Sequence, residues 1–422
     1  MRSLAWALVV GAVLAGTSGR ESSSRVINVA NPDELISALH APLEDVTIQI
    51  APGRYVLPGM DEHPGLGPCN SYATNDPVRV GVVVSGRRVR LVGSGVEATV
   101  IVSDAYFRIW FKDCADCELE HVAITGNDVD RSIAGDLIAG STMAGVLITK
   151  SRVRIANCVM KEDSATGLEG AGEVVRGTRP ANGVVGWKDA ELTIEFNEFS
   201  RNFSAISLRE NTHAAIRNNL IEGSGASDKI GNEAIDLMCD ATATVERNHF
   251  RGLTGGFYLG DTSSLIMKEN IVEDVYYAGI SMAGAYFTSP WSDKNIPDPG
   301  GKLGRVRIEQ NVIYNCGNAG IAVRTNGDQT ATRNIIVATG RIKPPVSAII
   351  AYGADAEAAV RKNTLYDNTV TNPALDRDVP REAFWRARRA WTRTYRNTPV
   401  GVDGRHKFYE SAFLTRYGRW AD

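Results

Sequence analysis

Short stretches of alternating apolar and polar residues recur along most of this chain, and segments of two kinds take turns. The first kind is a small residue followed by apolar residues at alternate positions, as in "SAISL" at Ser204 and "EAIDL" at Glu233. The second kind is an apolar residue, two variable residues, an asparagine, one further variable residue and another apolar residue. Alternation over so few residues is typical of β-strands with one buried side. Segments of the first kind start at Ala144, Asn182, Ser204, Glu233, Gly255, Ala278, Ala319 and Ser347, and the asparagines are Asn197, Asn219, Asn248, Asn270, Asn311, Asn334 and Asn363, with Asn157 a looser member.

The spacing of the two segments is regular. From the first inward apolar residue to the asparagine it is 13 residues in five of eight repeats, and from the asparagine to the next repeat it is 9 or 10 in four of seven. One turn therefore takes about 22 residues, with two or three short strands and no helical period. This pattern predicts an all-β solenoid, in which coils stack about 4.8 Å apart and bury one continuous core.

The recurrent asparagine has a structural explanation within such a solenoid. Its amide can bond to the backbone of the turn and to the asparagines of the coils above and below. The bend tolerates left-handed backbone geometry, which asparagine adopts more readily than most residues. The repeated ends are therefore expected to maintain the fold, while the residues between them face outward and vary.

The chain resembles the pectate-lyase-like superfamily of single-stranded right-handed parallel β-helix proteins. The repeats carry this resemblance, and "VTIQIAPGRYVL" (Val46–Leu57), "VRLVGSGVEATVIV" (Val89–Val102) and "CELEHVAITG" (Cys117–Gly126) look like that superfamily's opening strands and early coils. The likeness extends from about Val26 to Thr371. It implies the fold but not the activity, because lyases, hydrolases, epimerases and non-enzymatic surface proteins share these motifs.

The ends of the chain differ from the repeats. Residues 1–19 have one early arginine, an apolar stretch and small residues, the layout of a cleaved signal peptide, so we expect a secreted or periplasmic protein. Residues 26–45 predict a strand and a capping helix that starts at Pro32 after an Asn31 cap. The β-helix is expected over 46–371. Beyond it, 372–422 predicts a capping segment rich in arginine and aromatic residues, which would hide the open edge of the last coil.

The composition of the chain limits the classes of binding partner that we expect. A net charge of -3 over 422 residues gives no reason to expect nucleic acid, and no apolar stretch predicts a membrane span. Six cysteines are too few for a disulfide scaffold. In an oxidising compartment a local Cys114–Cys117 bridge is conceivable, whereas Cys69, Cys158, Cys239 and Cys316 are interpreted as buried small apolar residues. The oligomeric state is not predicted.

Aligning the first segments defines two columns of outward side chains on one sheet face, because side chains alternate along a strand. Insertions at Lys161–Ala181, Glu222–Asn232 and Ala285–Leu303 flank this face and are expected to form the walls of a groove. Gly260 and Ala283 would leave a shallow floor. The first column is Leu147, Val185, Ser207, Asp236, Tyr258, Ser281, Ala322 and Ile350, and the second is Thr149, Trp187, Arg209, Met238, Gly260, Ala283, Arg324 and Tyr352.

The residues of the middle rungs suit chemistry on an acidic sugar. β-Elimination needs a cation for the uronate carboxylate, a base for the α-proton and an acid for the leaving oxygen. Arg209 or Arg324 can supply the cation and Tyr258 the acid or base, and Asp236 completes the predicted catalytic set. The alternative without a catalytic role is an Arg209–Asp236 surface ion pair that contributes little to stability. The predicted substrate-binding residues are Trp187, Ser207, Glu233, Asp261, Tyr286, Trp291 and Tyr352.

Other chemistries remain open. Hydrolysis needs two carboxylates across the scissile bond, and Asp236 with Glu233, Asp240 or Asp261 can provide them. The same acidic residues are the one place for a Ca²⁺ ion, although no loop has dense acidic spacing. His213 is expected to be a solvated turn residue rather than a base.

The leading functional hypothesis is a polysaccharide lyase that acts on an extracellular uronic-acid polymer. The alternatives are a glycoside hydrolase or epimerase on the same fold, and a non-catalytic protein that binds a polysaccharide or a surface through the same groove. An accessory protein like the copper-site maturation β-helix proteins would need exposed His, Met or Cys sets, and only Met238 and Met282 come near the face.

Overall fold

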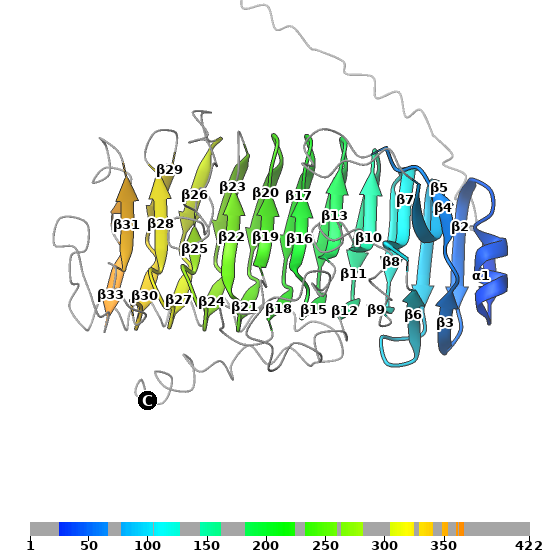
Figure 1. The fold of residues 1–422 in the computed structure, drawn as a ribbon, viewed down its shortest axis with the longest axis horizontal. Helices are drawn as coiled ribbons and strands as arrows, with labels where there is room; N and C mark the ends of the chain where they lie inside the picture. The colour runs from blue at the N-terminus through cyan, green and yellow to red at the C-terminus, as the bar shows by residue number, and fades with distance from the viewer. Residues whose placement is uncertain are drawn as a thin grey trace, which may run out of the picture.

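The computed structural model describes twelve stretches of the chain. They are residues 25–65, 77–103, 105–126, 144–161, 182–223, 233–259, 263–281, 304–324, 329–340, 348–352, 360–361 and 363–366. Over these residues short strands follow one another in coils that stack along a single axis (Figure 1). Each central coil adds one strand to each of three walls, which we call face 1, face 2 and face 3. The expected signal peptide (1–19) and C-terminal capping segment (372–422) lie outside the described residues.

Face 1 is formed by the strands that begin each repeat. Its N-terminal part is the first half of β5 (Val78–Gly93), with β4 (Met60–Glu62) beside it as the one antiparallel neighbour in the described sheets. The other strands of face 1 are β7 (Phe107–Ala115), β10 (Ala144–Thr149), β13 (Asn182–Trp187), β16 (Ser204–Leu208), β19 (Glu233–Leu237), β22 (Gly255–Leu259), β25 (Ile280–Ser281), β28 (Ile321–Arg324) and β31 (Ile349–Tyr352).

Face 2 follows face 1 around a bend, and face 3 closes each coil. Face 2 holds the second half of β5 with β1 (Arg25–Val29), β2 (Leu43–Ile50), β8 (Cys117–Glu120), β11 (Arg152–Ala156), β14 (Glu191–Glu195), β17 (His213–Arg217), β20 (Thr242–Glu246), β23 (Ser264–Lys268), β26 (Val306–Glu309), β29 (Gln329–Thr332) and β32 (Val360–Arg361). Face 3 is an 11-stranded sheet of β3 (Gly53–Leu57), β6 (Thr99–Ser103), β9 (Ala123–Gly126), β12 (Val159–Lys161), β15 (Glu198–Ser200), β18 (Leu220–Glu222), β21 (His249–Arg251), β24 (Ile271–Glu273), β27 (Val312–Tyr314), β30 (Ile335–Val337) and β33 (Thr364–Tyr366). The result is the predicted parallel β-helix.

The register between coils agrees with the repeat found in the sequence. On face 1, Val184 is paired with Ile206, Ile206 with Ile235, and Ile235 with Phe257. All four side chains are at most 2% exposed and belong to the continuous core inside the coils. A shift of one residue would turn this column outward, so the buried column fixes the register.

The predicted asparagine ladder is present. The side-chain amide of Asn219 donates to Oδ1 of Asn248 at 2.9 Å and to the carbonyl of Ile194 at 2.9 Å. The backbone N–H of Asn219 donates to the same Oδ1 at 2.9 Å. Asn197, Asn248, Asn270, Asn311 and Asn334 repeat this arrangement down to Asn363. All seven are buried and nearly every donor is satisfied within the stack, so the ladder removes the cost of burying these amides.

Two details of the ladder differ from the sequence interpretation. The left-handed backbone belongs to the residue before each asparagine, for example Asn218 (φ 56°) and Arg247 (φ 54°). In the coil before Asn197, the ladder position is held by Cys158, whose backbone N–H donates to Oδ1 of Asn197 at 2.9 Å. Asn157 is therefore one position early, and it adopts the left-handed bend (φ 54°) instead. Burial raises the pKa of Cys158 to about 12, so its thiol stays protonated.

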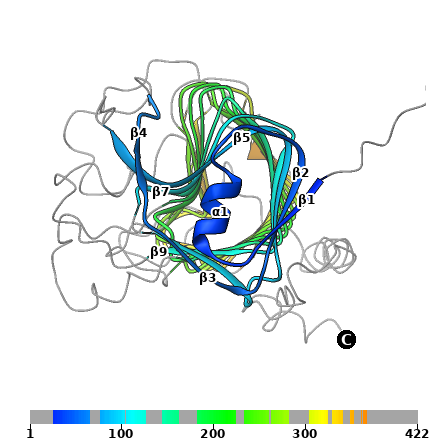
Figure 2. The same cartoon turned by 90° about the vertical axis from the view of Figure 1, so that its right-hand side faces the viewer.

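The N-terminal end of the solenoid is covered by α1 (Pro32–Ala38), which lies across its opening in Figure 2. The helix starts as predicted, because the side chain of Asn31 accepts from the N–H of Glu34 at 2.9 Å and Pro32 follows the cap. Leu35 and Leu39 join the core beneath the helix. This cap hides apolar side chains that the first coil would otherwise expose.

The cysteine interpretation needs two corrections. Cys114 and Cys117 are free and buried, so they form no bridge. Cys239 is disulfide-bonded and half-buried in the turn after β19, not a buried apolar residue. Cys158 and Cys316 are free and buried as expected, while Cys69 lies outside the described residues. No helix in the described stretches has the length and apolar character needed to cross a membrane.

Candidate functional site

Face 1 carries the outward columns in which the sequence predicted chemistry. Leu147 is paired with Val185, Val185 with Ser207, and Ser207 with Asp236, and Asp236 with Tyr258. Neighbouring members of this column lie one rung, about 4.8 Å, apart. The predicted alignment is therefore confirmed over these rungs.

The outward side of face 1 is not an open surface in its first coils. A second apolar cluster lies there, outside the main core, and consists of Val80, Phe107, Trp110, Ala144, Leu147, Val185 and Trp187. Leu147 is 0% exposed and Trp187 is 1% exposed. The strands "AGVLIT" and "NGVVGW" show why, because their residues are apolar or small on both sides, the pattern of a strand that is buried on both faces.

Where this apolar cluster ends, a polar group begins on the next two rungs. Nη2 of Arg209 donates to Oδ2 of Asp236 at 3.0 Å, and Nε of Arg209 donates to Oγ of Ser207 at 3.1 Å. Oγ of Ser207 in turn donates to Oδ2 of Asp236 at 3.1 Å. These three side chains form a closed triangle, which we call the face 1 triad (Ser207, Arg209 and Asp236).

The triad is deeply buried for a set of outward side chains. The side chains of Arg209 and Asp236 are each 7% exposed, and Ser207 is 1% exposed. The guanidinium of Arg209 also lies 5.4 Å from the ring centroid of Trp187, a cation–π distance. The pair is therefore not the exposed surface ion pair that the sequence left as the alternative.

One carboxylate oxygen of the triad is left over. Oδ1 of Asp236 is buried and has no hydrogen-bond partner, while Oδ2 accepts from both Ser207 and Arg209. Burial raises the pKa of Asp236 more than the charge of Arg209 and the bonds from Ser207 and Arg209 lower it. A buried acceptor without a partner is costly, and such groups together with shifted pKa values gather at functional sites.

Chemically, the triad joins a fixed cation to a proton acceptor. Arg209 uses Nε and Nη2 inside the triangle, so Nη1 remains available for an anion. A raised pKa makes Asp236 a better proton acceptor near neutral pH than an ordinary aspartate. The arrangement can therefore bind a carboxylate and take a proton from a carbon or oxygen beside it.

The other predicted site residues are placed only in part. The backbone of Tyr258 is in register with Asp236, and that of Arg324 is in register with Tyr352. The side chains of Tyr258, Arg324 and Tyr352 lie outside the described set. Glu233 is half-buried at the first position of β19, paired with Ser204 and Gly255. Asp261, Tyr286 and Trp291, the three insertions and the floor residues Gly260 and Ala283 lie outside the described residues, apart from the ends of two insertions.

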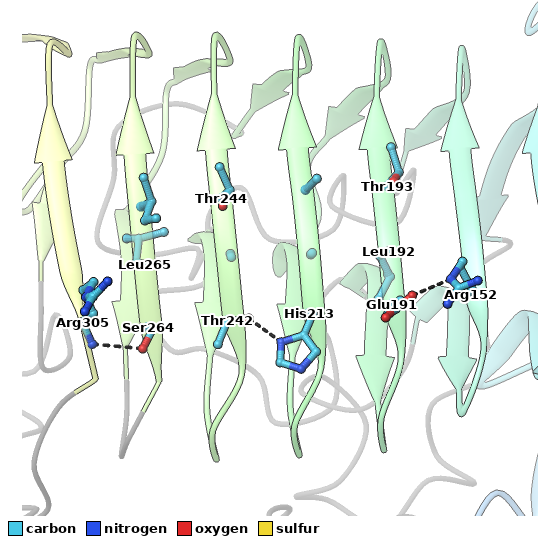
Figure 3. Close-up of a pocket in the computed structure, with 14 residues that line it drawn as sticks. Arg152, Glu191, Leu192, Thr193, His213, Thr242, Thr244, Ser264, Leu265 and Arg305 are labelled. Carbon is cyan, nitrogen blue, oxygen red and sulfur yellow. Dashed lines mark hydrogen bonds and ion pairs between the residues drawn. The ribbon is translucent and has the colours of Figure 1, made fainter. Parts of the chain in front are cut away.

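A depression of about 500 Å³ lies on face 2, away from the triad (Figure 3). Its middle rungs carry small side chains such as Ala215 and Thr244, and its edge carries Arg152 with Glu191 and Arg305. His213 lies there too, exposed at the start of β17 as expected, with Nδ1 2.5 Å from Oγ1 of Thr242. Every charged group in this lining is exposed, so the depression offers hydroxyls and ion pairs but no buried acid or base.

Metal chemistry has no support from the described side chains. Within those stretches, no group of three or more His, Cys, Asp or Glu side chains is placed to hold a metal ion. The Ca²⁺ set expected from the sequence included Asp261, which is not described, so this site stays a prediction.

Two features of the described chain were not predicted from the sequence. His249 and Glu273 form a buried pair on face 3, with Nε2 of the histidine 2.7 Å from Oε1 of the glutamate. The disulfide at Cys239 lies three positions after Asp236, on the same strand end. His249 follows ladder residue Asn248 directly, and its position alternates outward, so the repeat pattern carries no signal that this side chain would be buried.

The fold and the repeat place this chain among the parallel β-helix proteins, and the comparison with protein families agrees. The family model described as "Right handed beta helix region" matches residues 182–370, a stretch shorter than half of the chain. The fold is accordingly a right-handed parallel β-helix, as the resemblance to the pectate-lyase-like superfamily implied. No curated protein matches the sequence.

Solved structures with a similar fold include three proteins with low sequence identity. ORF18 of Geobacillus virus E2 is 12% identical, with a TM-score of 0.43, covering 81% of this chain and 59% of that chain. The periplasmic alginate epimerase AlgG is 12% identical, with a TM-score of 0.41, covering 69% of this chain and 62% of that chain. A pectate lyase from Bacillus sp. N165, Bsp165PelA in complex with trigalacturonate, is 15% identical, with a TM-score of 0.37, covering 88% and 93%.

This chain therefore spans about three-fifths of the length of the first two structures. At these identities the likeness concerns the fold alone. The activities of those proteins carry no argument for the residues of this chain, so the function rests on the triad itself.

Proposed function

We propose that this protein acts on a uronic-acid-containing polysaccharide at face 1, by β-elimination, with the triad as its chemical centre. The single observation that carries the proposal is the buried carboxylate oxygen Oδ1 of Asp236, which has no partner beside the buried guanidinium of Arg209. A fold would gain stability by satisfying or removing that oxygen, so its retention supports a chemical role.

The triad suits the first step of elimination. Nη1 of Arg209 would bind the uronate carboxylate and stabilise the negative charge that develops as the α-proton leaves. Oδ1 of Asp236 would accept that proton, and Ser207 would hold the carboxylate in place through its bond to Oδ2. The bond from C4 to the leaving oxygen then breaks, the C4–C5 double bond forms, and the leaving oxygen takes a proton from an acid, for which Tyr258 on the next rung is the candidate.

Hydrolysis fits the described residues less well. It needs a second carboxylate about 5 to 10 Å from the first, across the sugar. Glu233, one of the acids expected to pair with Asp236, lies three positions away on β19, so the two side chains leave the strand on opposite sides. The in-register neighbours of Asp236 are Ser207 and Tyr258, and neither is a carboxylic acid. Epimerisation shares the proton abstraction with elimination and differs in its product, so a product assay separates the two.

The strongest alternative is a non-catalytic polysaccharide-binding protein. The 7% exposure of the side chains of Arg209 and Asp236 favours it, because a pair so deeply buried can also serve only to hold the surface of face 1 in shape. In that case a polymer would bind over the triad without chemical change.

We also propose that the protein works outside the cytoplasm, in the periplasm or after secretion. The disulfide of Cys239 supports this location, since stable disulfides form in oxidising compartments.

The test is a product assay on the purified full-length chain. Pectate, alginate, hyaluronan and chondroitin are incubated with the protein, with and without Ca²⁺, and the ultraviolet absorbance of unsaturated uronate is followed. The proposal predicts a rise on one polymer, which falls by about a hundredfold or more in Asp236→Asn, the range expected for loss of a general base.

The matched control is Glu191→Gln, which changes a carboxylate to an amide on face 2, in an ion pair whose side chains are 62% and 53% exposed. It should leave the rate unchanged. Binding of a polymer without any product would instead assign the protein to the non-catalytic class. A product with an inverted C5 and no double bond would identify an epimerase.

A further inference from the structure

From β12 onward, the outer surface of face 3 changes from partly exposed to buried along the solenoid. In the first outward column, Val159 and Glu198 are half-buried in the early coils. Later members of the same column are buried, with exposed fractions of 8% for Leu220, 2% for His249, 0% for Ile271, 0% for Val312 and 3% for Ile335.

The second outward column changes in the same way from β12 onward, although two of its earlier members, Val102 (0% exposed) and Thr125 (8% exposed), are also buried. Lys161 is exposed, and Ser200, Glu222 and Arg251 are half-buried. From there on the column is closed to solvent, with exposed fractions of 1% for Glu273, 5% for Tyr314 and 0% for Val337.

This burial is not burial in the solenoid interior. The residues between the two columns point inward and fill the main core, among them Phe199, Ile221, Phe250, Val272 and Ile313. None of the later outward residues belongs to that core. We call the outward residues of β21, β24, β27 and β30 the covered patch, and it lies on the outside of the wall.

The covered patch also has a charge preference. Oε2 of Glu273 is buried without a hydrogen-bond partner, although Oε1 contacts His249. Next to it, burial and the charge of Glu273 raise the pKa of Asp274, while a hydrogen bond from Asn315 and the nearby His249 and Arg251 lower it. A cationic partner over this patch would relieve both effects.

One segment of the chain has the right starting point and chemistry. The last described strand, β33, belongs to face 3 and pairs with β30, so the residues after Tyr366 start from this face. The residues that follow, 367–422, include eleven arginine or lysine residues against seven acidic ones, and nine aromatic residues. A segment both apolar and basic suits an apolar patch in which a buried oxygen of Glu273 has no hydrogen-bond partner.

We propose that the segment 367–422 packs along the outer surface of face 3 and covers β21, β24, β27 and β30. Its aromatic side chains lie on Ile271, Val312 and Ile335, and its arginines face Glu273. This differs from the cap over the open edge of the last coil that the sequence suggested, and it does not depend on the proposed function. The dimensions agree, because the stretch 379–397 as a helix is about 28 Å long and four rungs span about 15 Å.

Photo-cross-linking of the full-length chain tests the occupant of the patch. A benzophenone amino acid replaces Val312 in one protein and Val159 in a second, since both occupy the same outward column. Mass spectrometry then identifies the linked peptides. The proposal predicts that links from position 312 fall within 367–422 and that links from position 159 do not.

Three outcomes would overturn it. Links from position 312 to another part of the chain, such as 282–303, would name a different cover. Links that double the mass would show that a second copy covers the patch. Absence of any link at 312, with a link or none at 159, would mean that no protein segment lies there.

A second experiment uses thiol labelling and does not depend on cross-linking chemistry. Val312→Cys should resist labelling in the full-length chain and lose that protection when the chain ends after Asn372. Val159→Cys should react at the same rate in both lengths. Protection of position 312 in the shortened chain, with the β-sheet circular dichroism intact, would contradict the proposal.

Discussion

Faces 1 and 2 are built from the same repeat, yet their outward side chains have opposite surroundings. On face 1, Arg209 and Asp236 form a pair with side chains 7% exposed, beside a cluster of outward apolar residues. On face 2, Arg152 and Glu191 form a pair whose side chains are 62% and 53% exposed. An outward position in a solenoid therefore defines only a direction, and the surroundings decide whether the group is a solvated ion or a buried one with altered chemistry.

The largest expected difference between the faces comes from removing one partner of each ion pair. Asp236→Ala leaves the guanidinium of Arg209 buried without its counter-ion and should lower the free energy of unfolding by about 3–5 kcal/mol. Glu191→Ala should have no measurable effect, because solvent replaces the lost partner. Urea unfolding followed by circular dichroism measures both. Equal losses in the two variants would mean that the face 1 pair is solvated like the face 2 pair.

A similar difference is expected for apolar outward residues. Leu147 is 0% exposed on face 1, so Leu147→Ala should cost about 2–5 kcal/mol of unfolding free energy, as in a protein core. Ile266 is 41% exposed on face 2, and Ile266→Ala should change stability by about 0.5 kcal/mol or less. Thermal unfolding of the two variants compares them directly. A small loss at Leu147 would show that the outward cluster of face 1 is not a true second core.

The hydroxyl within the triad should have a smaller effect. Ser207→Ala removes the bonds to Asp236 and Arg209 and leaves both groups buried, at a cost of about 1–3 kcal/mol. Thr244, on the floor of the face 2 depression, makes no side-chain hydrogen bond among the described residues, so Thr244→Ala is the control. Chemical denaturation measures the pair. If Thr244→Ala lowers the free energy of unfolding as much as Ser207→Ala does, the hydrogen bonds of Ser207 do not explain the stability of the triad.

The smallest expected effect is that the contributions of Asp236 and Glu195 to folding stability change with pH in opposite directions. Burial raises the pKa of Asp236 above its ordinary value of 3.8, so its contribution to stability is complete below that value and is lost as pH rises through the raised pKa. Burial also raises the pKa of Glu195 on face 2, but the hydrogen bonds and charges of Arg154 and Arg217 outweigh it, so the pKa is lowered from its ordinary value of 4.5. Its contribution is present above that value and is lost as pH falls.

Unfolding free energies of the natural protein, Asp236→Asn and Glu195→Gln between pH 3 and pH 8 would reveal the two signs. The advantage of the natural protein over Asp236→Asn should shrink as pH rises, while its advantage over Glu195→Gln should grow. The same slope for both carboxylates would contradict the difference between the faces.

The fold was predictable from the sequence because local and long-range signals coincide in a solenoid. The period of 22 residues gave the coils, the inward columns and the asparagine ladder, since every coil repeats the same contacts with its neighbour. The shift at Asn157 is the expected kind of error: Cys158 makes the ladder contact with its backbone N–H, and no side-chain pattern reports that.

The site was predictable only in its positions. Alternation placed Ser207, Arg209 and Asp236 on one face, and the structure shows them bonded to one another. Their burial did not follow from the repeat, because burial on an outer face depends on parts of the chain that are far away in sequence. The same reason applies to His249 and Glu273 on face 3, which look like surface residues in the repeat and are at most 2% exposed.

The most direct test of the account is the formation of unsaturated uronate by the natural protein, Asp236→Asn and Glu191→Gln under identical conditions, with folding of each verified by circular dichroism. If face 1 carries the reaction, the natural protein and Glu191→Gln form product at equal rates, and the rate falls by about a hundredfold or more in Asp236→Asn. Equal rates in all three proteins would contradict it, because the buried carboxylate of face 1 would then take no part in the reaction.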